Sequence, residues 1–491
     1  MTKSKTYSKK IPWFLGVAAG LYSFMYFFSR KPAILDSWEH YAFMIGLFLV
    51  IPIVTFFIIQ KLKEFKPPFT KPRLLTFFSV FYFLAFVQQI TFTQHHKKLI
   101  ALSFVVAILV AYFLYKHLLK IAMLELLLAL LTIPLLLNAI MLKSSYDTSW
   151  AAQTDDIEEA VFKKKPNVYF IEPDGYANFS ELKKELYQVD NSEFEGFLAK
   201  EGFKNYPTFR SNYTSTLSSN ASFFAMKHHY FNEDLRSDEV DNARDVIMYD
   251  NAVLRVFKNN GYKPYFISDT PYLLSTRPRT LYEETNFGFW DVSFLDNGIS
   301  THREDVVGAF KQFVNEEITQ PKFFFIQFIK PWHIRGKISG TYGKVDERER
   351  WIERLEEANE MLTEIISEIK RKDPEGLIVI MADHGGYVGL NYSDESRTKT
   401  TDPDKITTIF SSQLSIHWPN GEAPAYDGEL DSAVNVFRGL ITYLSEDESY
   451  LKQLQDDSSY IMLREGIEEG IYAYINDAGE LVCRPHPIKI K

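Results

Sequence analysis

The chain has 491 residues and a single cysteine, Cys483. An intramolecular disulfide is therefore impossible, and every folded part must be stabilised by its own core. A cleavable signal peptide is also lacking, because the first apolar run, Ile11–Phe28, is long, rich in aromatic residues and followed by Ser-Arg-Lys instead of small residues. We expect this run to remain as a membrane anchor.

Acidic residues are scarce in residues 1–150, which carry 16 Lys and Arg against 5 Asp and Glu. Because the whole chain has a formal net charge of −9, the remaining residues carry −20. Such an acidic second part argues against nucleic acid as a partner and is compatible with the binding of a divalent cation.

Long apolar runs are confined to residues 1–142. Five of them approach the ~20 residues that a helix needs to cross a bilayer. We predict a bundle of five transmembrane helices here, at about Ile11–Phe28, Tyr41–Gln60, Leu74–Phe92, Leu99–Tyr115 and Ile121–Leu142. Glu125 lies near the cytoplasmic end of the last run, so we expect its carboxylate to reach towards the membrane surface.

The distribution of positive charge predicts the orientation of this bundle. With the N-terminus in the cytoplasm, the loops between spans on the outside carry only Arg30, Lys31, Lys97 and Lys98. The inside segments carry Lys3, Lys5, Lys9, Lys10, Lys61, Lys63, Lys66, Lys71, Arg73, Lys116 and Lys120. Five spans then place everything after Leu142 outside the cytoplasmic (inner) membrane. This orientation depends on the short connection Lys116–Lys120. If the last two runs formed one span, the rest of the chain would lie on the cytoplasmic side.

Residues 143–165 are polar and predict a tether, and residues 166–491 predict one extracytoplasmic domain with a smaller C-terminal subregion. Apolar strand-like runs alternate with helical stretches in this part, which is typical of an α/β layered domain. The predicted strands are Val168–Ile171, Tyr262–Ile267, Lys322–Ile329, Leu377–Met381 and Leu414–Trp418. The predicted helices are Ser192–Glu201, Leu217–His228, Ala252–Asn259, Arg303–Glu317, Glu347–Lys370 and Ser432–Leu444.

Two of the predicted strands end in groups that bind metals. Leu377–Met381 runs into Asp383 and His384 at a glycine turn, and Val168–Ile171 runs into Glu172, Asp174 and a glycine. The carboxyl ends of strands in an open α/β sheet face the reactive crevice, so these side chains are predicted to meet at one cation. Taken singly, each has a simpler interpretation, in which the Asp caps a turn and the His packs in the core.

A cluster of hydroxyl residues, 211–226, lies between the two strands and opens a predicted helix. A hydroxyl at a helix N-terminus lies beside unpaired backbone N–H groups, which favour a phosphate. A simple helix cap is the alternative.

The order of these motifs resembles the alkaline phosphatase superfamily. It comprises Pro-Asn-Val-x5-Asp-Gly-Tyr from Pro166, Thr-x-x-Ser from Thr216, a His that follows a Pro in the loop after a strand, and Asp-His-Gly. Within the superfamily the chain resembles the membrane-anchored sulfatase-like branch, which includes lipoteichoic acid synthases and lipid A phosphoethanolamine transferases. Residues 435–438, Asn-Val-Phe-Arg, are similar too. The resemblance implies five membrane helices before a C-terminal α/β sandwich of alkaline phosphatase/sulfatase-like type.

The resemblance also implies roles for particular residues. Thr216 corresponds to the nucleophile, with Thr214, Ser215 and Ser218 as alternatives, and His333 corresponds to a histidine that meets the substrate phosphate or leaving group. One divalent metal, Mn²⁺, Zn²⁺ or Mg²⁺, would be held by Asp174, Thr216, Asp383 and His384.

The chain departs from its relatives at three points. No Cys/Ser-x-Pro-x-Arg motif is present for conversion to formylglycine, which argues against sulfate-ester hydrolysis by that route. Residue 329, four before His333, is Ile and not the Asp of two-metal phosphodiesterases. No histidine follows Asp-His-Gly closely, and His417 is expected to pack in the core.

The implied function is that of a metal-dependent phosphotransferase, which moves a phospho-headgroup from a membrane phospholipid donor to an envelope acceptor through a phosphothreonine intermediate. A metal-dependent phosphodiesterase, phosphatase or sulfatase-like hydrolase of external esters is the alternative. A catalytically inactive sensor or scaffold is the third hypothesis. The identities of donor and acceptor and the oligomeric state remain open.

Overall fold

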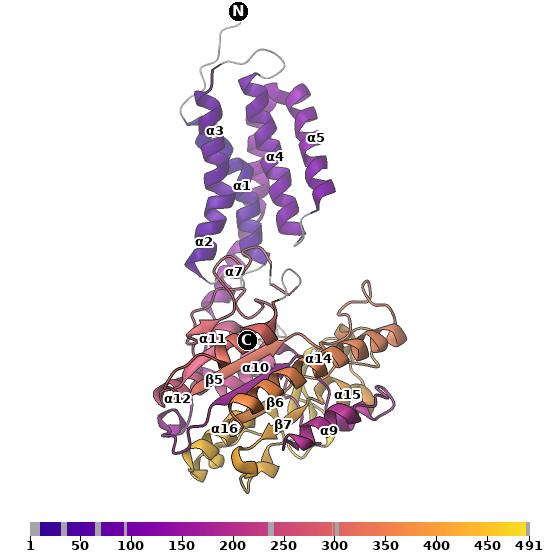
Figure 1. The fold of residues 1–491 in the computed structure, drawn as a ribbon. Helices are drawn as coiled ribbons and strands as arrows, with labels where there is room; N and C mark the ends of the chain where they lie inside the picture. Colours follow the sequence, from indigo (N-terminus) through magenta and orange to yellow (C-terminus); the bar gives the residue numbers. More distant parts are fainter. Residues whose placement is uncertain are drawn as a thin grey trace, which may run out of the picture. The chain divides into compact units, whose positions relative to one another are not determined.

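The computed structural model describes residues 10–30, 37–63, 70–92, 96–233, 240–296, 298–299 and 304–487 (Figure 1). The chain divides into two compact units. The first, called the helical unit here, comprises Met1–Tyr146, Leu274–Arg277 and Val292–Asn297. The second, called the sheet unit, comprises Asp147–Leu273, Pro278–Asp291 and Gly298–Lys491.

The helical unit contains apolar helices separated by short breaks. In chain order they are α1 (Ile11–Arg30), α2 (Trp38–Ile45), the π-helix η1 (Gly46–Val50), α3 (Ile51–Lys61), α4 (Lys71–Thr91), α5 (Lys97–Leu114), the 3₁₀ turn η2 (Tyr115–His117), α6 (Leu118–Leu131) and α7 (Ile133–Ser144). Among the described residues, 4 continuous helical stretches are long and apolar enough to cross a membrane, at Ile11–Arg30, Trp38–Lys61, Lys71–Thr91 and Lys97–Ala151. The last contains both the fourth and the fifth predicted runs, so length and composition alone do not confirm five spans.

Contacts within the helical unit define the direction of α5. The guanidinium of Arg73, near the start of α4, lies 4.9 Å from the ring centre of Tyr115, just after the end of α5. Near the other end of α4, the side-chain amide of Gln88 donates a hydrogen bond of 3.0 Å to the carbonyl of Leu99 at the start of α5. Helix α5 therefore runs antiparallel to α4.

Helix α6 runs in the opposite direction to α5. Leu118, its first residue, packs in one cluster with Leu75 of α4, and Ser79, one turn further along α4, donates a hydrogen bond of 3.0 Å to Glu125. The carboxylate of Glu125 is 4% exposed. The prediction that it reaches the membrane surface is wrong, because its partner is a hydroxyl inside the bundle.

The sheet unit is built on a seven-stranded sheet with the order β2-β7-β6-β1-β5-β3-β4. Its strands are β1 (Val168–Pro173), β2 (Lys204–Asn205), β3 (Lys263–Ser268), β4 (Glu284–Thr285), β5 (Lys322–Phe328), β6 (Leu377–Met381) and β7 (Leu414–His417). Strand β1 is parallel to both of its neighbours, β5 and β6, whereas β7 is antiparallel to β6 and to β2. The C-terminal ends of β1 and β6 therefore meet at one edge of the sheet.

Alternate side chains of the central strands face two separate layers of helices, as the period of a strand requires. Tyr169 and Ile171 of β1 pack in a cluster with Trp351 of helix α14. Phe170 points to the other face, where its ring lies 5.6 Å from Phe223 and 4.9 Å from Phe437. Every residue of β1 is buried, which explains its continuous apolar sequence.

The α-helices of the sheet unit are α8 (Phe179–Leu182), α9 (Ser192–Lys200), α10 (Thr216–Ala225), α11 (Ala243–Met248), α12 (Ala252–Asn259), α13 (Val306–Val314), α14 (Lys344–Lys372), α15 (Pro403–Phe410) and α16 (Ala433–Ser445). All five strands and all six helices predicted from the sequence overlap elements of this unit. Their ends differ by a few residues, and α12 matches its predicted range.

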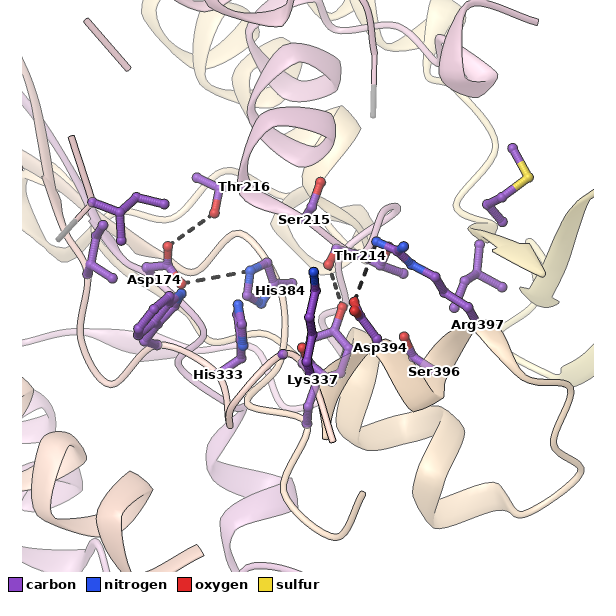
Figure 2. A pocket seen from close by; sticks show the side chains of 18 of the residues that line it. Asp174, Thr214, Ser215, Thr216, His333, Lys337, His384, Asp394, Ser396 and Arg397 are labelled. Carbon is purple, nitrogen blue, oxygen red and sulfur yellow. Dashed lines mark hydrogen bonds and ion pairs between the residues drawn. The ribbon is translucent and has the colours of Figure 1, made fainter. Parts of the chain in front are cut away.

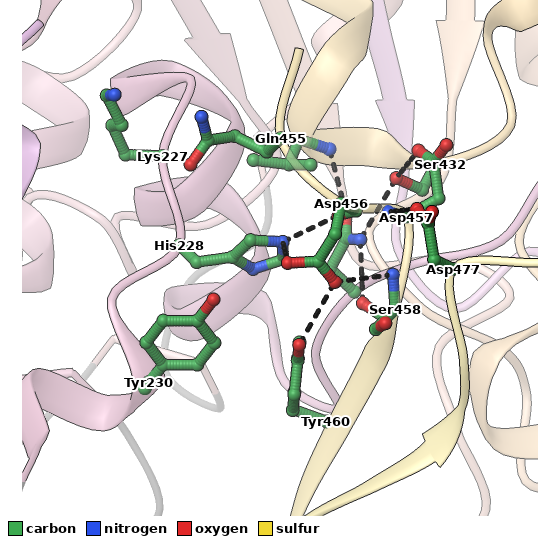
Figure 3. A network of polar contacts seen from close by, with 12 residues as sticks. Lys227, His228, Tyr230, Ser432, Gln455, Asp456, Asp457, Ser458, Tyr460 and Asp477 are labelled. Atoms are coloured by element: carbon green, nitrogen blue, oxygen red, sulfur yellow. Dashed lines mark hydrogen bonds and ion pairs between the residues drawn. The ribbon is translucent and has the colours of Figure 1, made fainter. Parts of the chain in front are cut away.

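A second, antiparallel sheet, β8 (Ser459–Leu463), β9 (Gly470–Ile475) and β10 (Leu481–Pro485), forms the C-terminal subregion. Buried polar side chains join the segment before it to the residues after α10 (Figure 3). The Nε2 atom of His228 lies 2.8 Å from the carbonyl oxygen of Asp456, and the Tyr460 hydroxyl donates to the Asp456 carboxylate at 3.0 Å.

The residues predicted to form a tether pack within the sheet unit from Asp147 onward. The fully buried guanidinium of Arg438, in α16, contacts Asp155 at 2.6 Å and the side-chain carbonyl of Gln153 at 2.9 Å. The Asn-Val-Phe-Arg motif thus anchors the start of the sheet unit to its core. The domain boundaries inferred from the sequence remain predictions.

Candidate metal and catalytic site

Strand β6 delivers Asp383 and His384 to a turn of two glycines. The Oδ1 atom of Asp383 accepts hydrogen bonds of 3.0 Å from the backbone N–H groups of Gly175 and His384, which ties the end of β6 to the end of β1. A side chain cannot replace the hydrogen of Gly386, because its Cβ would lie 2.5 Å from the indole nitrogen of Trp351. The turn thus keeps the two side chains in place by close packing.

Strand β1 delivers Asp174, and α10 begins at Thr216 beside it. The Thr216 hydroxyl donates a hydrogen bond of 3.1 Å to Oδ2 of Asp174. The ligand atoms of Asp174, Asp383 and His384 all lie within 4.8 Å of one another, and all three residues are buried. The structure therefore brings together the four residues that the sequence predicted as metal ligands.

The polar atoms of this cluster fit a cation. His384 Nδ1 lies 2.8 Å from the Gly385 carbonyl, to which it donates, so Nε2 faces the carboxylates, 3.4 Å from Oδ2 of Asp383. That Oδ2 atom is buried and has no hydrogen-bond partner among the described residues. A neutral imidazole lone pair would repel it, whereas a cation between them would attract both. The donor set of carboxylates, imidazole and hydroxyl suits a hard or borderline divalent ion.

Glu172, two residues before Asp174, is fully buried beneath the cluster. The amides of Asn220 and Gln327 donate to its Oε1 atom at 3.0 and 2.7 Å. Burial, followed by the nearby charge of Asp383, raises the pKa of this carboxyl well above its ordinary value. Glu172 is therefore not the partner of the Thr216 hydroxyl, which donates its hydrogen bond to Asp174.

His333 follows Trp332 in the loop after β5. Its ring centre lies 5.9 Å from that of His384, and its Nδ1 atom contacts the Ile334 carbonyl. Burial, followed by the nearby charge of His384, lowers the pKa of His333 to about 3. The imidazole is therefore neutral near pH 7, and its Nδ1–H donates to the carbonyl, so Nε2 is left as an acceptor.

A pocket of about 330 Å³ opens onto these groups (Figure 2). It is lined by Asp174, Thr216, His333 and His384, by the hydroxyls of Thr214, Ser215, Ser393 and Ser396, and by Lys337, Asp394 and Arg397, among others. In Figure 2, Arg397 and Asp394 lie on the side of the pocket away from Asp174. Of the alternative nucleophiles, Thr214 and Ser215 line the pocket, and Ser218 lies one turn into α10.

Several pocket residues were not found from the sequence. Tyr387, three residues after His384, has a left-handed backbone with φ of 60° and donates its hydroxyl to the carbonyl of Thr214. Lys337 and Arg397 come from irregular loops that follow β5 and β6. Arg397 lies in the segment after the strand that delivers Asp383 and His384, and Lys337 lies four residues after His333 in the same loop. This proximity in sequence is the only signal that could have pointed to them. His417, as expected, is buried elsewhere, with Nδ1 at 3.0 Å from the Gly376 carbonyl.

No protein-family model matches this sequence. No curated protein matches it either.

Solved structures of bacterial proteins are similar to this chain. The C-terminal periplasmic domain of EptC from Escherichia coli aligns with 64% of this chain and 95% of its own length, at 12% identity and a TM-score of 0.43. The lipoteichoic acid synthase LtaP from Listeria monocytogenes aligns with 67% of this chain and 91% of its own length, at 14% identity and a TM-score of 0.41. The integral membrane phosphoethanolamine transferase EptA from Neisseria meningitidis aligns with 89% of this chain and 96% of its own length, at 12% identity and a TM-score of 0.40. The function of this chain is therefore argued from its own residues.

Proposed function

We propose that the protein is a metal-dependent phosphotransferase, which moves a phospho-headgroup from a membrane lipid to an acceptor of the cell envelope. One observation carries this proposal. A hydroxyl that opens a helix lies 3.1 Å from a carboxylate, and that carboxylate belongs to a buried carboxylate–imidazole cluster at the wall of a pocket.

Thr216 is the proposed nucleophile. Its hydroxyl lies at the first residue of α10, where the backbone N–H groups of the helix have no partners in the preceding turn and can stabilise the oxygens of a phosphoryl group. In-line attack of its Oγ1 on the phosphorus of a phosphodiester forms a phosphothreonine and expels the lipid alcohol. Attack by an acceptor hydroxyl on this ester then regenerates Thr216 and completes the transfer.

Asp174, Asp383, His384 and Thr216 would hold the divalent cation. When bound, such an ion supplies positive charge that favours the deprotonated hydroxyl and the phosphoryl oxygens. When no ion is bound, Asp174 orients the Thr216 hydroxyl by accepting its hydrogen bond of 3.1 Å.

The proposed role of His333 follows from its neutral state. With a pKa lowered to about 3, it carries no proton to donate to a leaving group near pH 7. Its Nε2 can instead accept a hydrogen bond from an attacking acceptor alcohol and orient it. The proposed role of His333 is therefore to position the acceptor in the second half of the reaction.

We further propose that the helical unit spans the membrane five times, with the sheet unit outside the cytoplasm. The antiparallel arrangement of α5 with α4, and the parallel arrangement of α6 with α4, support a reversal of the chain at Tyr115–His117. An odd number of spans agrees with the distribution of positive charge in the loops.

The alternative function is hydrolysis of external phosphate esters. The experiment that separates the two uses the full-length protein with Mn²⁺ in lipid nanodiscs of defined phospholipids. A transferase releases diacylglycerol and forms product in proportion to an added alcohol acceptor, whereas a hydrolase releases diacylglycerol and a free phosphomonoester without one. Mass spectrometry of peptides covering residues 209–227 should detect the added phospho-headgroup on Thr216. If no lipid is cleaved and no adduct forms, the proposal is wrong.

A further inference from the structure

One loop of the sheet unit differs in charge from the rest of that unit. Residues 335–345, called the basic loop here, contain Arg335, Lys337 and Lys344 and no Asp or Glu. They follow β5 and end in the first two residues of α14. Because the chain after residue 150 is strongly acidic, an anionic surface repels most of the sheet unit and attracts this loop.

Apolar side chains of the basic loop face solvent. Ile338 is 72% exposed, Val345 67% and Tyr342 47%. The guanidinium groups of Arg350 and Arg335 lie 4.1 and 5.1 Å from the centre of the Tyr342 ring. Exposed apolar side chains that alternate with basic ones are typical of a surface that lies in a membrane interface.

The backbone of the basic loop is fixed against the rest of the sheet unit. The buried carboxylate of Glu347 accepts hydrogen bonds from the backbone N–H groups of Tyr342 at 3.0 Å and of Arg335 at 3.1 Å. The Thr341 hydroxyl donates to the Asn391 carbonyl at 2.7 Å. The apolar side chains are therefore presented in one arrangement, and binding has little further loop ordering to offset.

We propose that the basic loop docks on the lipid surface of the membrane that holds the helical unit, and that anionic headgroups strengthen this contact. The lipid surface is the partner that the chain itself supplies, because the helical stretches are long and apolar enough to enter a bilayer. It also matches both properties of the loop, since anionic headgroups lie directly above apolar chains. Ile338 and Val345 would enter the interface, with Lys344 at the level of the phosphates.

Docking of the basic loop would place the mouth of the catalytic pocket at the membrane. Gly336 and Lys337 line that pocket together with His333 and His384 (Figure 2). An ester carried by the bilayer would then have a short path to the pocket. The docking itself needs no turnover, so it goes beyond the proposed transfer function.

The test uses the full-length Cys483→Ser protein with a bimane label on Ser339→Cys, at an exposed position of the basic loop. The protein is reconstituted in nanodiscs of phosphatidylcholine alone or of phosphatidylcholine with phosphatidylserine. Quenching of the label by nitroxides on the lipid acyl chains is measured. We expect quenching to be about threefold or more stronger in the anionic nanodiscs.

Removal of the apolar side chains in the double variant Ile338→Ser, Val345→Ser should abolish most of the quenching by lipid. Val161→Ser is the matched control, because Val161 is 74% exposed in the sheet unit outside the loop, and quenching should not change. Lys344→Gln should reduce the difference between the two nanodiscs by about half or more. Lys372→Gln, at the opposite end of α14, should keep that difference.

Two results overturn the inference. A label that aqueous iodide quenches fully, and lipid nitroxides do not, would lie in water. A label that is protected from iodide and also from lipid nitroxides would contact protein instead of lipid. Thr216→Ala should show the same quenching as its parent, so a failure of the proposed catalysis and a failure of docking give separate results.

Discussion

The sheet unit contains two clusters of histidine and carboxylate that differ in how their polar atoms are satisfied. The carboxylate in the cluster of His228, Asp456, is exposed, whereas Asp174 and Asp383 in the cluster of His384 are buried. Around His228, the ring nitrogens contact the Tyr213 hydroxyl at 3.1 Å and the Asp456 carbonyl at 2.8 Å. The Asp456 carboxylate accepts from the Tyr460 hydroxyl at 3.0 Å and the Ser458 backbone N–H at 3.1 Å. This cluster, shown in Figure 3, is complete without a further ligand.

In and around the cluster of Asp383, His384 and Asp174, some buried oxygen atoms lack a hydrogen-bond partner in the described part of the chain. One oxygen of Asp383 and one oxygen of Glu172 are buried without a hydrogen-bond partner among the described residues. Buried polar groups are normally paired, so unpaired ones indicate either strain or a ligand. The comparison teaches that residue types alone do not define a site here, and that the cluster around Asp383 is distinguished by buried oxygen atoms without a hydrogen-bond partner among the described residues.

The largest expected effect is the loss of turnover in Thr216→Ala. Removal of a nucleophile from a preorganised site costs on the order of 10⁴-fold or more in kcat. The fold should be kept, because the Thr216 side chain makes one hydrogen bond, to Asp174. Rates of diacylglycerol release measure the effect. Thr214→Ala and Ser218→Ala should each lose less than about tenfold, and a larger loss in either would move the nucleophile there.

Asp383→Asn should abolish metal binding while it preserves size. In the wild type, metal at 100 times its Kd should stabilise the folded state by about 2.7 kcal/mol, which raises the Tm. We expect no such rise in Asp383→Asn, measured by thermal unfolding with and without Mn²⁺ and by metal content after gel filtration. His228→Ala serves as the control and should retain the metal response, because its cluster needs no ion.

His228→Ala should instead lower stability in the absence of metal. The buried ring fills space between α10 and the C-terminal sheet and joins Tyr213 to Asp456, so its removal should cost about 2–4 kcal/mol. Chemical denaturation followed by circular dichroism measures this change. Turnover per folded molecule should be unaffected, and a loss of turnover at full folding would contradict a purely structural role.

The smallest effect is the pH dependence contributed by His229. Burial lowers its pKa to about 3, whereas the unfolded chain binds a proton below about pH 6.5. The unfolded state therefore binds more protons between these values, and stability falls as the pH falls, by about 2 kcal/mol at pH 5. His229→Gln should flatten the dependence of the Tm on pH between 7 and 5. An unchanged slope would show that other groups cause it.

Much of the sheet could be predicted because its strands are continuous apolar runs that end in polar turns. The range Leu377–Met381 was predicted without error, since a buried parallel strand needs apolar residues on both faces. Asp174, Asp383 and His384 were predicted for a related reason, because the ends of parallel strands must meet at one edge of the sheet.

The remaining features depend on contacts between distant segments. Strands β8 to β10 have only 5 or 6 residues each, and β10 is largely exposed, so no sequence period identified them. Arg397 and Lys337 reach the pocket through irregular loops whose course is set by tertiary hydrogen bonds, such as that from Ser393 N–H to the Arg335 carbonyl at 2.9 Å. The 3₁₀ turn between α5 and α6, Tyr115–His117, overlaps the connection Lys116–Lys120 that the sequence predicted from its charges, although the turn contains neither proline nor glycine.

The glycine turn after His384 cannot accept larger residues, whereas other loops that line the pocket can vary in sequence. A side chain at Gly385 would collide with the backbone carbonyl of Thr408, and one at Gly386 with Trp351. Variants selected for a new donor should therefore accumulate in the loop of Ser393 and Arg397, while this turn stays constant. Directed evolution of the protein would gain most from libraries restricted to that loop.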